Sequence, residues 1–539
     1  MLLDYVGDDA QSVGIFVLLA MMLRVLTGVS SYSGMNDPPK YGDYEAQRHW
    51  MELAVNLPVR EWYTDSPVNN ASYWPLDYPP LSGYQSWVCG VALRAVEPEA
   101  LALVASHGHE SPQSKLAMRY SVLAFDLAVY IPAAVWAVRV FYGRPAPSDP
   151  PSARTARVLA LAALLLNPAL LLIDHGHFQY NCISLGCTLA AVAAIGSGRR
   201  LLGAALFCLA LNHKQMSLFY APAFFAHLLG WALHDPAHRS VGQKLFAVVK
   251  LGVTVIATFA LCWAPYLTST EAVLQVLTRI FPVRRGLYED YVANWWCATS
   301  LFIKWKSLFP APTLLRAAAA TTLAVAAPAM AHQIAGRGAE GADRGAGGPS
   351  KWGLAWSLVN SAFAFFMFSY QVHEKSILLP LLPLTLLAGR EPTLAVGLPL
   401  LACVSMFPLL VRDGLALPYA AHVMLYGAVL APTAVQYGRQ LQAELGGGRS
   451  AGLLSHAVRG CSALVLRFWG VLAVLATAAG VGLHVAREVV PAPENLPWLH
   501  DRLFITFAFA GFAVAFVYTQ CRQWMDGSGG KKRKSGKSE

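Results

Sequence analysis

The stretch VGIFVLLAMMLRVLTGV, residues 13–29, decides the fold class of this chain. Arg24 is its only charged side chain, and an apolar run of about 17 to 25 residues is long enough for a helix to span the hydrocarbon core of a bilayer. No small-residue cleavage site follows a short apolar core, so we interpret the stretch as a retained anchor and not as a removed signal peptide. The sequence therefore predicts a membrane protein from its first helix onward.

Similar apolar runs recur along the chain and predict an all-α polytopic membrane protein with about 14 transmembrane helices in a single domain, residues 1–539. The composition agrees, because 55% of the 539 residues are hydrophobic, 13% are charged and the mean hydropathy is +0.43. A soluble domain carries about 25% charged residues, so a soluble enzyme, a disordered chain and a fibrous protein are excluded. After residues 13–29, the candidate spans are 117–141, 157–173, 180–195, 201–211, 215–231, 245–267, 313–331, 352–368, 376–387, 393–410, 417–437, 461–483 and 503–519.

Basic residues orient these spans. The net charge of +10 arises from 41 lysines and arginines against 31 acidic residues, and the basic residues gather in the connections between alternate spans. Because such loops stay in the cytosol, we expect both termini there, with a flexible Gly/Ala-rich linker (332–351) and a basic tail (520–539). The tail is suited to retrieval or to binding the headgroups of anionic membrane lipids. No basic face interleaved with aromatics indicates a nucleic-acid partner, and the nine cysteines form no CxxC pair.

One apolar run, Leu81–Val96, does not fit this alternation. If it crossed the membrane, half of the basic connections would fall on the wrong side. We therefore place it inside a large first luminal loop, residues 30–116, as a re-entrant or membrane-associated helix.

The polar segments of the chain all fall on the luminal side of this topology. They come from different loops, so they can converge on one site, which a purely structural protein has little reason to build. These segments are residues 41–50, 76–81, 174–181, 212–215, 279–296 and 371–376.

Asp43 is the first candidate for chemistry, in the stretch YGDYEAQRHW at residues 41–50. On local grounds it could simply be a helix N-cap. However, Glu45 and Arg48 crowd the same turns, with more titratable groups than a cap needs. A carboxylate beside an acceptor hydroxyl is suited to general-base work, and Glu45 and Arg48 are then candidate substrate contacts.

The stretch YWPLDYPP at residues 73–80 cannot be helical, because its prolines forbid it. Trp74, Asp77 and Tyr78 make it an aromatic, acidic loop on which a sugar ring could stack, although an aromatic belt at the membrane interface is an equally good interpretation. Just before it, Asn70-Ala71-Ser72 is an N-glycosylation acceptor tripeptide if the loop is luminal.

Two further segments combine histidine, carboxylate and cationic side chains. In DHGHFQYN at residues 174–181, Asp174, His175 and His177 could hold a metal, but hydrogen bonding to a polar substrate, with Asp174, His177 and Gln179 as contacts, is favoured because no second ligand cluster has suitable spacing. In YQVHEKS at residues 370–376, His373 and Lys375 are suited to stabilising a phosphate leaving group, with Glu374 as a further contact. Snorkelling of Lys375 to the membrane surface is the alternative.

A pair of arginines completes the candidates. Arg284 and Arg285 could bind a phosphate through charge-assisted hydrogen bonds, or form internal ion pairs with Glu289 and Asp290.

Taken together, the segments YGDYEAQRHW, NLPVREWY, LDYPPL, LLIDHGHFQYN, LNHKQM, FPVRRGLYEDYVANWWC and FSYQVHEKSILLP closely resemble one family, the endoplasmic-reticulum dolichyl-phosphate-glucose glucosyltransferases of N-glycan assembly. The matching segments run from about residue 35 to 380. Among the members, those that add the first glucose to the nine-mannose oligosaccharide are most similar, and those that add the second glucose are the nearest competitors.

The resemblance implies a GT-C glycosyltransferase fold with a luminal active site in the endoplasmic-reticulum membrane. It also implies a dolichyl-phosphate-glucose donor, a lipid-linked oligosaccharide acceptor and no metal cofactor. The family's catalytic aspartate falls on Asp43, and its later HEKS element, residues 373–376, is implied to contact the donor phosphate. We expect a single inverting displacement in which Asp43 takes the acceptor proton. A transporter or lipid flippase is the alternative from another class, but no matched broken repeats are apparent.

Overall fold

The structure, a computed structural model, describes residues 10–39, 41–144, 146, 148–281, 286–288, 290–337, 348–446 and 477–526. Helices dominate this part of the chain, as the sequence predicts. The described residues hold no β-strand, and two isolated backbone bridges occur, between Ser66 and Asn69 and between Tyr288 and Val372.

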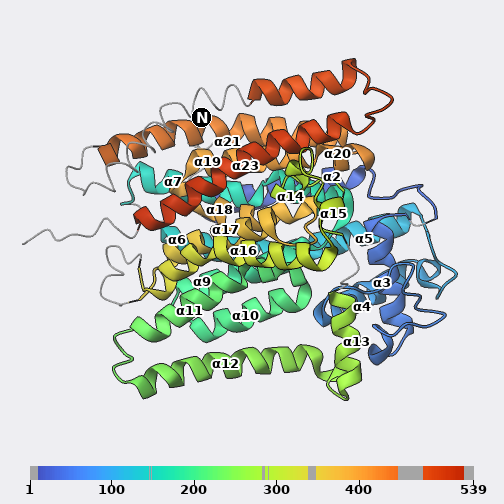
Figure 1. Cartoon of the computed structure of the whole chain (residues 1–539), viewed down its shortest axis with the longest axis horizontal. Coiled ribbons are helices and arrows are strands. Elements are labelled where there is room, and N and C mark those ends of the chain that lie inside the picture. Colours follow the sequence, from blue (N-terminus) through green and yellow to red (C-terminus); the bar gives the residue numbers. More distant parts are fainter. Residues whose placement is uncertain are drawn as a thin grey trace, which may run out of the picture.

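Helices of different lengths form an elongated bundle (Figure 1). Its members are α2 (Ala10–Val29), α5 (Pro112–Phe125), α6 (Ile131–Tyr142), α7 (Pro151–Leu165), α8 (Pro168–Leu171), α9 (Asn181–Gly196), α10 (Arg200–His213), α11 (Ala221–His234), α12 (Val241–Trp263), α16 (Ala311–Ile334), α17 (Lys351–Phe368), α18 (Leu378–Leu386), α19 (Pro392–Ser405), α21 (Ala416–Gly446) and α23 (Leu499–Asp526). Wide turns of the π type continue α5 into α6 and extend α8 as η4 (Leu172–Phe178).

Within the described part of the chain, six helical segments are long and apolar enough to cross a membrane: Pro112–Tyr142, Pro151–Phe178, Gln215–His234, Val241–Tyr266, Ala311–Ile334 and Leu499–Met525. Four shorter apolar helices accompany them, Val13–Val29, Asn181–Gly196, Arg200–His213 and Pro392–Ser405. The prediction of a polytopic helical membrane protein is therefore confirmed. The count of 14 spans stays a prediction, because the run 393–410 is divided between α19 and α20 (Phe407–Arg412) and most of the run 461–483 lies outside the described residues.

The central and peripheral helices differ in how they are buried. The most apolar window of Pro151–Phe178 is entirely buried inside the protein, whereas only 17% of the corresponding window of Val241–Tyr266 is buried. Residues 151–178 therefore lie in the interior of the bundle. Helix α12 lies at its edge, and Figure 1 shows it along the bottom. Side chains such as Leu261 and Ile256 of α12 are exposed, as expected for a surface that faces lipid.

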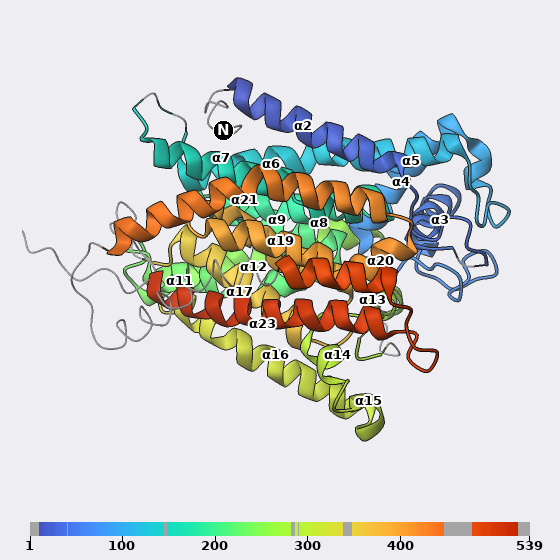
Figure 2. The same cartoon turned by 90° about the horizontal axis from the view of Figure 1, so that it is seen from above.

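The first loop forms a compact cap at one end of the bundle (Figure 2). It contains α3 (Asp43–Asn56), α4 (Pro80–Val96) and the short turns Val59–Glu61 and Pro98–Leu101, with α13 (Thr270–Ile280) beside it. Residues 73–79 are not helical, as predicted from their prolines, but Pro80, predicted with them, begins α4, because proline is tolerated at the first helical position. Residues 81–96 are helical, and α4 packs against α3 and α10.

The predicted basic connections lie at the other end. In both views the α6–α7 turn, the α11–α12 turn and the carboxyl end of α16 lie opposite the cap (Figures 1 and 2). These connections carry Arg144, Arg239 and Arg337. Of the predicted linker and tail, residues 338–347 and 527–539 lie outside the described part of the chain.

Candidate active site

Asp43 is the first residue of α3, and a close backbone contact fixes its position. Gly42 is the N-cap, so the interpretation of Asp43 as the cap is wrong. The backbone of Gly34, at φ +76°, lies so close to Gly42 that a Cβ on Gly34 would come within 2.0 Å of the Gly42 nitrogen. The Asp43 amide donates to Ser33 Oγ at 3.3 Å. This packing turns the Asp43 carboxylate toward the centre of the molecule.

Two distant chain segments converge on one oxygen of Asp43. Lys375 Nζ donates to Asp43 Oδ2 at 2.7 Å, and His177 Nε2 lies 3.0 Å from the same oxygen. The Gln179 side-chain amide also donates to it. Lys375 Nζ lies 3.0 Å from His177 Nε2. The predicted convergence of residues 41–50, 174–181 and 371–376 is thus confirmed.

This cluster opens into a cavity of about 1040 Å³. Its lining contains ten of the residues singled out from the sequence: Asp43, Trp74, Asp77, Tyr78, His177, Gln179, Asp290, His373, Glu374 and Lys375. Polar residues that the sequence analysis did not choose also line it, among them Asn181, Lys214, Arg412 and Asp413. A cavity of this size with aromatic walls and both charges can hold a sugar and a phosphate together.

The charges around Asp43 determine its protonation. Burial alone would raise the pKa of Asp43, but Lys375 and His177 hold it well below its usual range. Burial lowers the pKa of Lys375, and the carboxylates of Asp43 and Glu374 more than offset this, so that it is raised. Burial raises the pKa of Glu374. In the free protein Asp43 is therefore an anion paired with a cationic Lys375.

Asp413 is a functional candidate that the sequence analysis missed. Its Oδ2 lies 2.5 Å from His177 Nδ1, and its side chain is buried. The turn that carries it depends on Gly414, which has φ +72° and where a Cβ would approach Ser31 Oγ to 2.8 Å. The only sequence signal was a charged pair and a glycine, RDG at residues 412–414, between two apolar runs.

Lys214 lies in the predicted polar segment 212–215 but was not among the predicted site residues. Its Nζ donates to Gln179 Oε1 at 3.0 Å and to Asn181 Oδ1 at 2.7 Å, and lies 5.0 Å from the Tyr78 ring. Burial, followed by repulsion from Lys375, lowers its pKa to about 8. Because Gln179 also donates to Asp43, Lys214 is linked to the base candidate through one side chain.

Glu45 and Arg48, predicted as substrate contacts, do not line the cavity. The Arg48 guanidinium binds both oxygens of Glu45 at 2.6 Å and Glu52 Oε2 at 2.8 Å, and it also donates to the carbonyl of Ala100. Its side chain is fully buried. These charges hold α3 to the end of the first loop.

Asp174 is likewise enclosed, away from the cavity lining. Its carboxylate accepts from Asn181 Nδ2 at 2.7 Å and from the Cys182 amide at 2.8 Å. Its neighbour His175 binds Asp126 at 2.6 Å, whereas His177 faces Asp43 and Asp413. The three side chains therefore bind different partners within the protein, and the favoured hydrogen bonding of this segment to a polar substrate stays a prediction.

One group of metal-type ligands does occur in the described residues. The ligand atoms of His49, Glu52 and His107 lie within 4.8 Å of one another. However, Arg48 already binds Glu52 Oε2, and Ser106 Oγ donates to the same oxygen at 2.8 Å. A cationic guanidinium at this distance disfavours a second cation there.

The remaining predicted residues are Arg284, Arg285, Glu289 and Asp290, which are close together in the sequence. Arg284, Arg285 and Glu289 fall outside the described residues. Asp290 lines the cavity and pairs with Arg412 at 3.2 Å. The bridge between Tyr288 and Val372 brings this loop beside residues 373–376.

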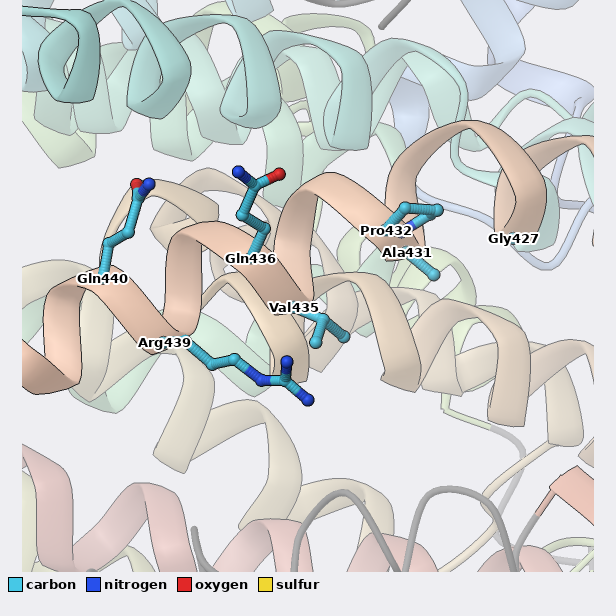
Figure 3. A pocket seen from close by; sticks show the side chains of 7 residues that line it. All are labelled: Gly427, Ala431, Pro432, Val435, Gln436, Arg439 and Gln440. Atoms are coloured by element: carbon cyan, nitrogen blue, oxygen red, sulfur yellow. The ribbon is translucent and has the colours of Figure 1, made fainter.

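A second recess, of about 600 Å³, lies on the surface of α21 (Figure 3). Figure 3 shows Gln436 and Gln440 pointing to one side of the helix and Arg439 to the other. Its lining residues are Gly427, Ala431, Pro432, Val435, Gln436, Arg439 and Gln440. They include no carboxylate or histidine, so the recess offers no general base.

The fold and the site define a class. This is a polytopic helical membrane protein with a carboxylate–lysine–histidine centre in a large polar cavity at one end of its bundle. The chain belongs to the ALG6, ALG8 glycosyltransferase family, whose model matches residues 18–518. It is therefore a membrane-embedded glycosyltransferase.

Three of the curated proteins similar to this chain illustrate the match. A protein of Arabidopsis thaliana named "Probable dolichyl pyrophosphate Man9GlcNAc2 alpha-1,3-glucosyltransferase" is 41% identical over 94% of this chain and 88% of its own length. Proteins named "Dolichyl pyrophosphate Man9GlcNAc2 alpha-1,3-glucosyltransferase" are similar too. The one of Gallus gallus is 42% identical over 76% of this chain and 77% of its own length, and that of Saccharomyces cerevisiae is 34% identical over 97% and 93%.

Proposed function

We propose that this protein transfers the first glucose from dolichyl-phosphate glucose to the lipid-linked oligosaccharide Man9GlcNAc2-PP-dolichol and forms an α-1,3 linkage. The names of its relatives, which cover most of the chain, support the acceptor and the linkage. The observation that carries the proposal is the Asp43 carboxylate, which faces a cavity beside Lys375 and His373. A base, a cation and a sugar-sized space are what a transfer from a phosphate-linked donor requires.

Asp43 acts as the general base. Its contacts with Lys375, His177 and Gln179 all fall on Oδ2, so Oδ1 is left to accept a proton from the acceptor's 3-hydroxyl. As that proton moves, the acceptor oxygen bonds to C1 of glucose and the bond from C1 to the phosphate oxygen breaks. One displacement from the β-linked donor of this family gives the α-linked product.

The leaving group needs positive charge but no acid. The phosphate monoester leaves as an anion, and its developing charge is stabilised by preorganised cations, here Lys375 and His373. No divalent cation enters this scheme, and transfer is expected to persist in EDTA. Arg284 and Arg285 are proposed as further phosphate contacts.

The ion pair in the free protein suggests how the base is activated. Lys375 holds the pKa of Asp43 well below its usual range, which makes Asp43 a weak base while the pair is intact. A donor phosphate competes for the Lys375 ammonium. When Lys375 turns to the phosphate, the pKa of Asp43 rises toward its ordinary value, so base strength appears only once the donor is bound.

The same proposal places the cavity in the endoplasmic-reticulum lumen. The basic connections lie at the opposite end of the bundle from the cap (Figure 1), and such connections remain cytosolic. The first loop, residues 30–116, is then luminal, both termini are cytosolic, and the chain crosses the membrane about 14 times.

The test uses purified full-length protein with radiolabelled dolichyl-phosphate glucose. It compares acceptors that carry nine mannoses and either no glucose or one glucose. Incorporation into the glucose-free acceptor supports the proposal, incorporation only into the other indicates the second-glucose reaction, and lipid movement without transfer indicates a flippase.

The base assignment has its own variant. Asp43→Asn should lower kcat by roughly 10²- to 10⁴-fold, the usual contribution of a general base. Asp65→Asn, on the same loop but outside the cavity lining, is the matched control and should keep the wild-type rate. Near-normal turnover of Asp43→Asn would overturn the assignment.

A further inference from the structure

His177 lies between two carboxylates that come from distant parts of the chain. Its Nε2 is 3.0 Å from Asp43 Oδ2, and its Nδ1 is 2.5 Å from Asp413 Oδ2. The side chains of His177 and Asp413 are only 2% and 4% exposed. His177 therefore links the proposed base, Asp43, to a second carboxylate, Asp413, which is buried.

The geometry determines what His177 must carry. A neutral imidazole donates from one nitrogen and presents a lone pair at the other. With a carboxylate at each nitrogen, one of the two contacts would then set a lone pair against an anion. In the free protein Lys375 Nζ also lies 3.0 Å from Nε2, and its ammonium can donate to a neutral ring there. Once Lys375 has moved to the donor phosphate, Nε2 faces the Asp43 carboxylate without it, and an imidazolium, which donates to both carboxylates, is then the form that satisfies both contacts.

We propose that Asp413 is a positioning residue that holds His177 as an imidazolium, and that this imidazolium keeps the Asp43 carboxylate oriented after Lys375 has moved to the donor phosphate. Asp413 contacts His177 and not Asp43, so it acts on the proposed base through His177. The inference rests on the proposed function, since it assigns Asp43 as the base.

The local backbone supports a functional role for this segment. Phe178, directly after His177, has φ +91°, a conformation that is rare for an aromatic residue. Such strain persists only where surrounding packing enforces it. Here the Phe178 ring is held by an edge contact with Tyr44 at 5.0 Å and by the Arg119 guanidinium at 5.3 Å.

The charge environment of His177 is mixed. Asp43 and Lys375 face it directly, as does Asp413, and Arg119 donates to the Gly176 carbonyl beside it. Charged or titratable groups on the elements packed around it include Arg24, Asp43, Glu45, Arg48, His49, Glu52, Arg119, Asp126, Asp174, His175, Lys214, Glu374, Lys375, Arg412, Asp413 and His422. Asp413 faces Nδ1 of His177, so replacing Asp413 acts on His177 and leaves the Asp43 side chain itself unchanged.

The first measurement needs no turnover. Protein labelled with ¹³C-histidine is examined by NMR in detergent, and the His177 signal is assigned by its loss in His177→Gln. We expect imidazolium shifts for His177 at neutral pH in Lys375→Met, where no ammonium faces Nε2, and a neutral ring in the double variant Lys375→Met, Asp413→Asn. A neutral ring in Lys375→Met would overturn the proposal, whether or not the protein transfers glucose.

The second measurement is the pH dependence of kcat/KM for the donor. The pKa of Lys214 is about 8, so its titration would overlap the alkaline limb of the profile. The profiles are therefore measured in a Lys214→Arg background. In Asp413→Asn the alkaline limb should move about one unit to lower pH, which lowers kcat/KM about tenfold on that limb. Asp413→Glu keeps the charge and should restore the limb in part. An unmoved limb would contradict the proposal.

A double-mutant cycle separates positioning from simple packing. If Asp413 acts through His177, Asp413→Asn should change kcat/KM less than about twofold in a His177→Gln background, whereas independent effects multiply. Asp126→Asn is the matched control, because Asp126 holds His175 at 2.6 Å in the same segment without contacting Asp43. Its profile should keep the wild-type limb. If wild-type protein transfers no glucose at all, the proposed function fails, and the NMR result still decides the state of His177.

Discussion

Lys375 donates a hydrogen bond to the Asp43 carboxylate, which it releases in the proposed reaction. Its Nζ lies 2.7 Å from Asp43 Oδ2, so the two charges neutralise each other in the free protein. Lys375→Met should remove the cation that stabilises the leaving phosphate, and kcat/KM for the donor should fall roughly 10²- to 10³-fold. The change is measured with purified protein at saturating acceptor. Lys304→Met, on an exposed residue outside the cavity lining, is the control. An unchanged kcat/KM would mean that Lys375 only balances Asp43.

At this scale the sequence reveals residues whose chemistry stands out locally. Asp43 and His373 to Ser376 could be chosen because charged groups next to apolar runs are costly unless they function. Asp413 could not be chosen in this way, since its role depends on a contact with His177 across 236 positions of sequence. Arg48, predicted as a substrate contact, does not line the cavity, and the reason is the opposite one. Its charge looks available in the sequence, but Glu45 and Glu52 bury it completely.

At the scale of elements, buried charge holds α3 in the first loop. Glu52 accepts from Arg48 at 2.8 Å and from the Val104 amide at 2.7 Å. Burial alone would raise its pKa, yet His49 and Arg48 lower it from 4.5 to about 2. A depressed carboxylate pKa contributes stability above pH 4.5 that is lost as the pH falls toward 2. Glu52→Gln should therefore cost about 3 kcal/mol at pH 7.

Thermal unfolding in detergent checks this contribution. The difference in midpoint between wild type and Glu52→Gln should be large at pH 7 and shrink below pH 4.5. Glu61→Gln, an exposed residue of the same loop, should leave the midpoint unchanged. A difference that is constant with pH would show that Glu52 does not stabilise the fold through its charge.

The turn between α20 and α21 offers a second test at this scale. Gly414 and Gly143 both have positive φ, +72° and +82°, so alanine at either position should cost about 1 to 3 kcal/mol of stability. Only at Gly414 does a Cβ meet a neighbour, Ser31 Oγ at 2.8 Å, whose hydroxyl binds the Asp413 carbonyl. Gly414→Ala should therefore also lower the transfer rate, whereas Gly143→Ala should not. Equal rates for the two variants would show that the turn does not position Asp413.

Helix identity was predictable because apolar runs of this length have few other outcomes. Residues 157–173 lie in the central helix and 245–267 in a peripheral one. Helix interruptions were less predictable. The run 393–410 reads as one span, but it divides between α19 and α20 next to Met406.

At the scale of the whole molecule, the alternation of spans made the site predictable. A chain that crosses a membrane repeatedly returns every second loop to the same face, so segments far apart in sequence can meet. Residues 43, 78, 214 and 375 do meet in one cavity. Which side chains face the cavity depends on packing within the cap, which no period in the sequence encodes.

The orientation of the molecule can be tested at Asn70, which begins the only Asn-X-Ser/Thr tripeptide in the sequence. Asn70 is exposed in the cap, and its Oδ1 accepts from Ser72 Oγ at 2.7 Å. If this end is luminal, Asn70 should be glycosylated in a eukaryotic host. The protein should then gain mobility on treatment with peptide-N-glycosidase, and Asn70→Gln should remove that shift.

The matched control creates an acceptor tripeptide at the other end of the bundle. His238→Asn, in an Asn70→Gln background, turns residues 238–240 of the α11–α12 turn into such a tripeptide. Because this turn carries Arg239 and lies opposite the cap (Figure 1), it should stay unmodified. Modification at position 238 without modification at position 70 would reverse the molecule in the membrane. It would place the Asp43 cavity in the cytosol, where an enzyme that elongates a luminal oligosaccharide could not reach its acceptor.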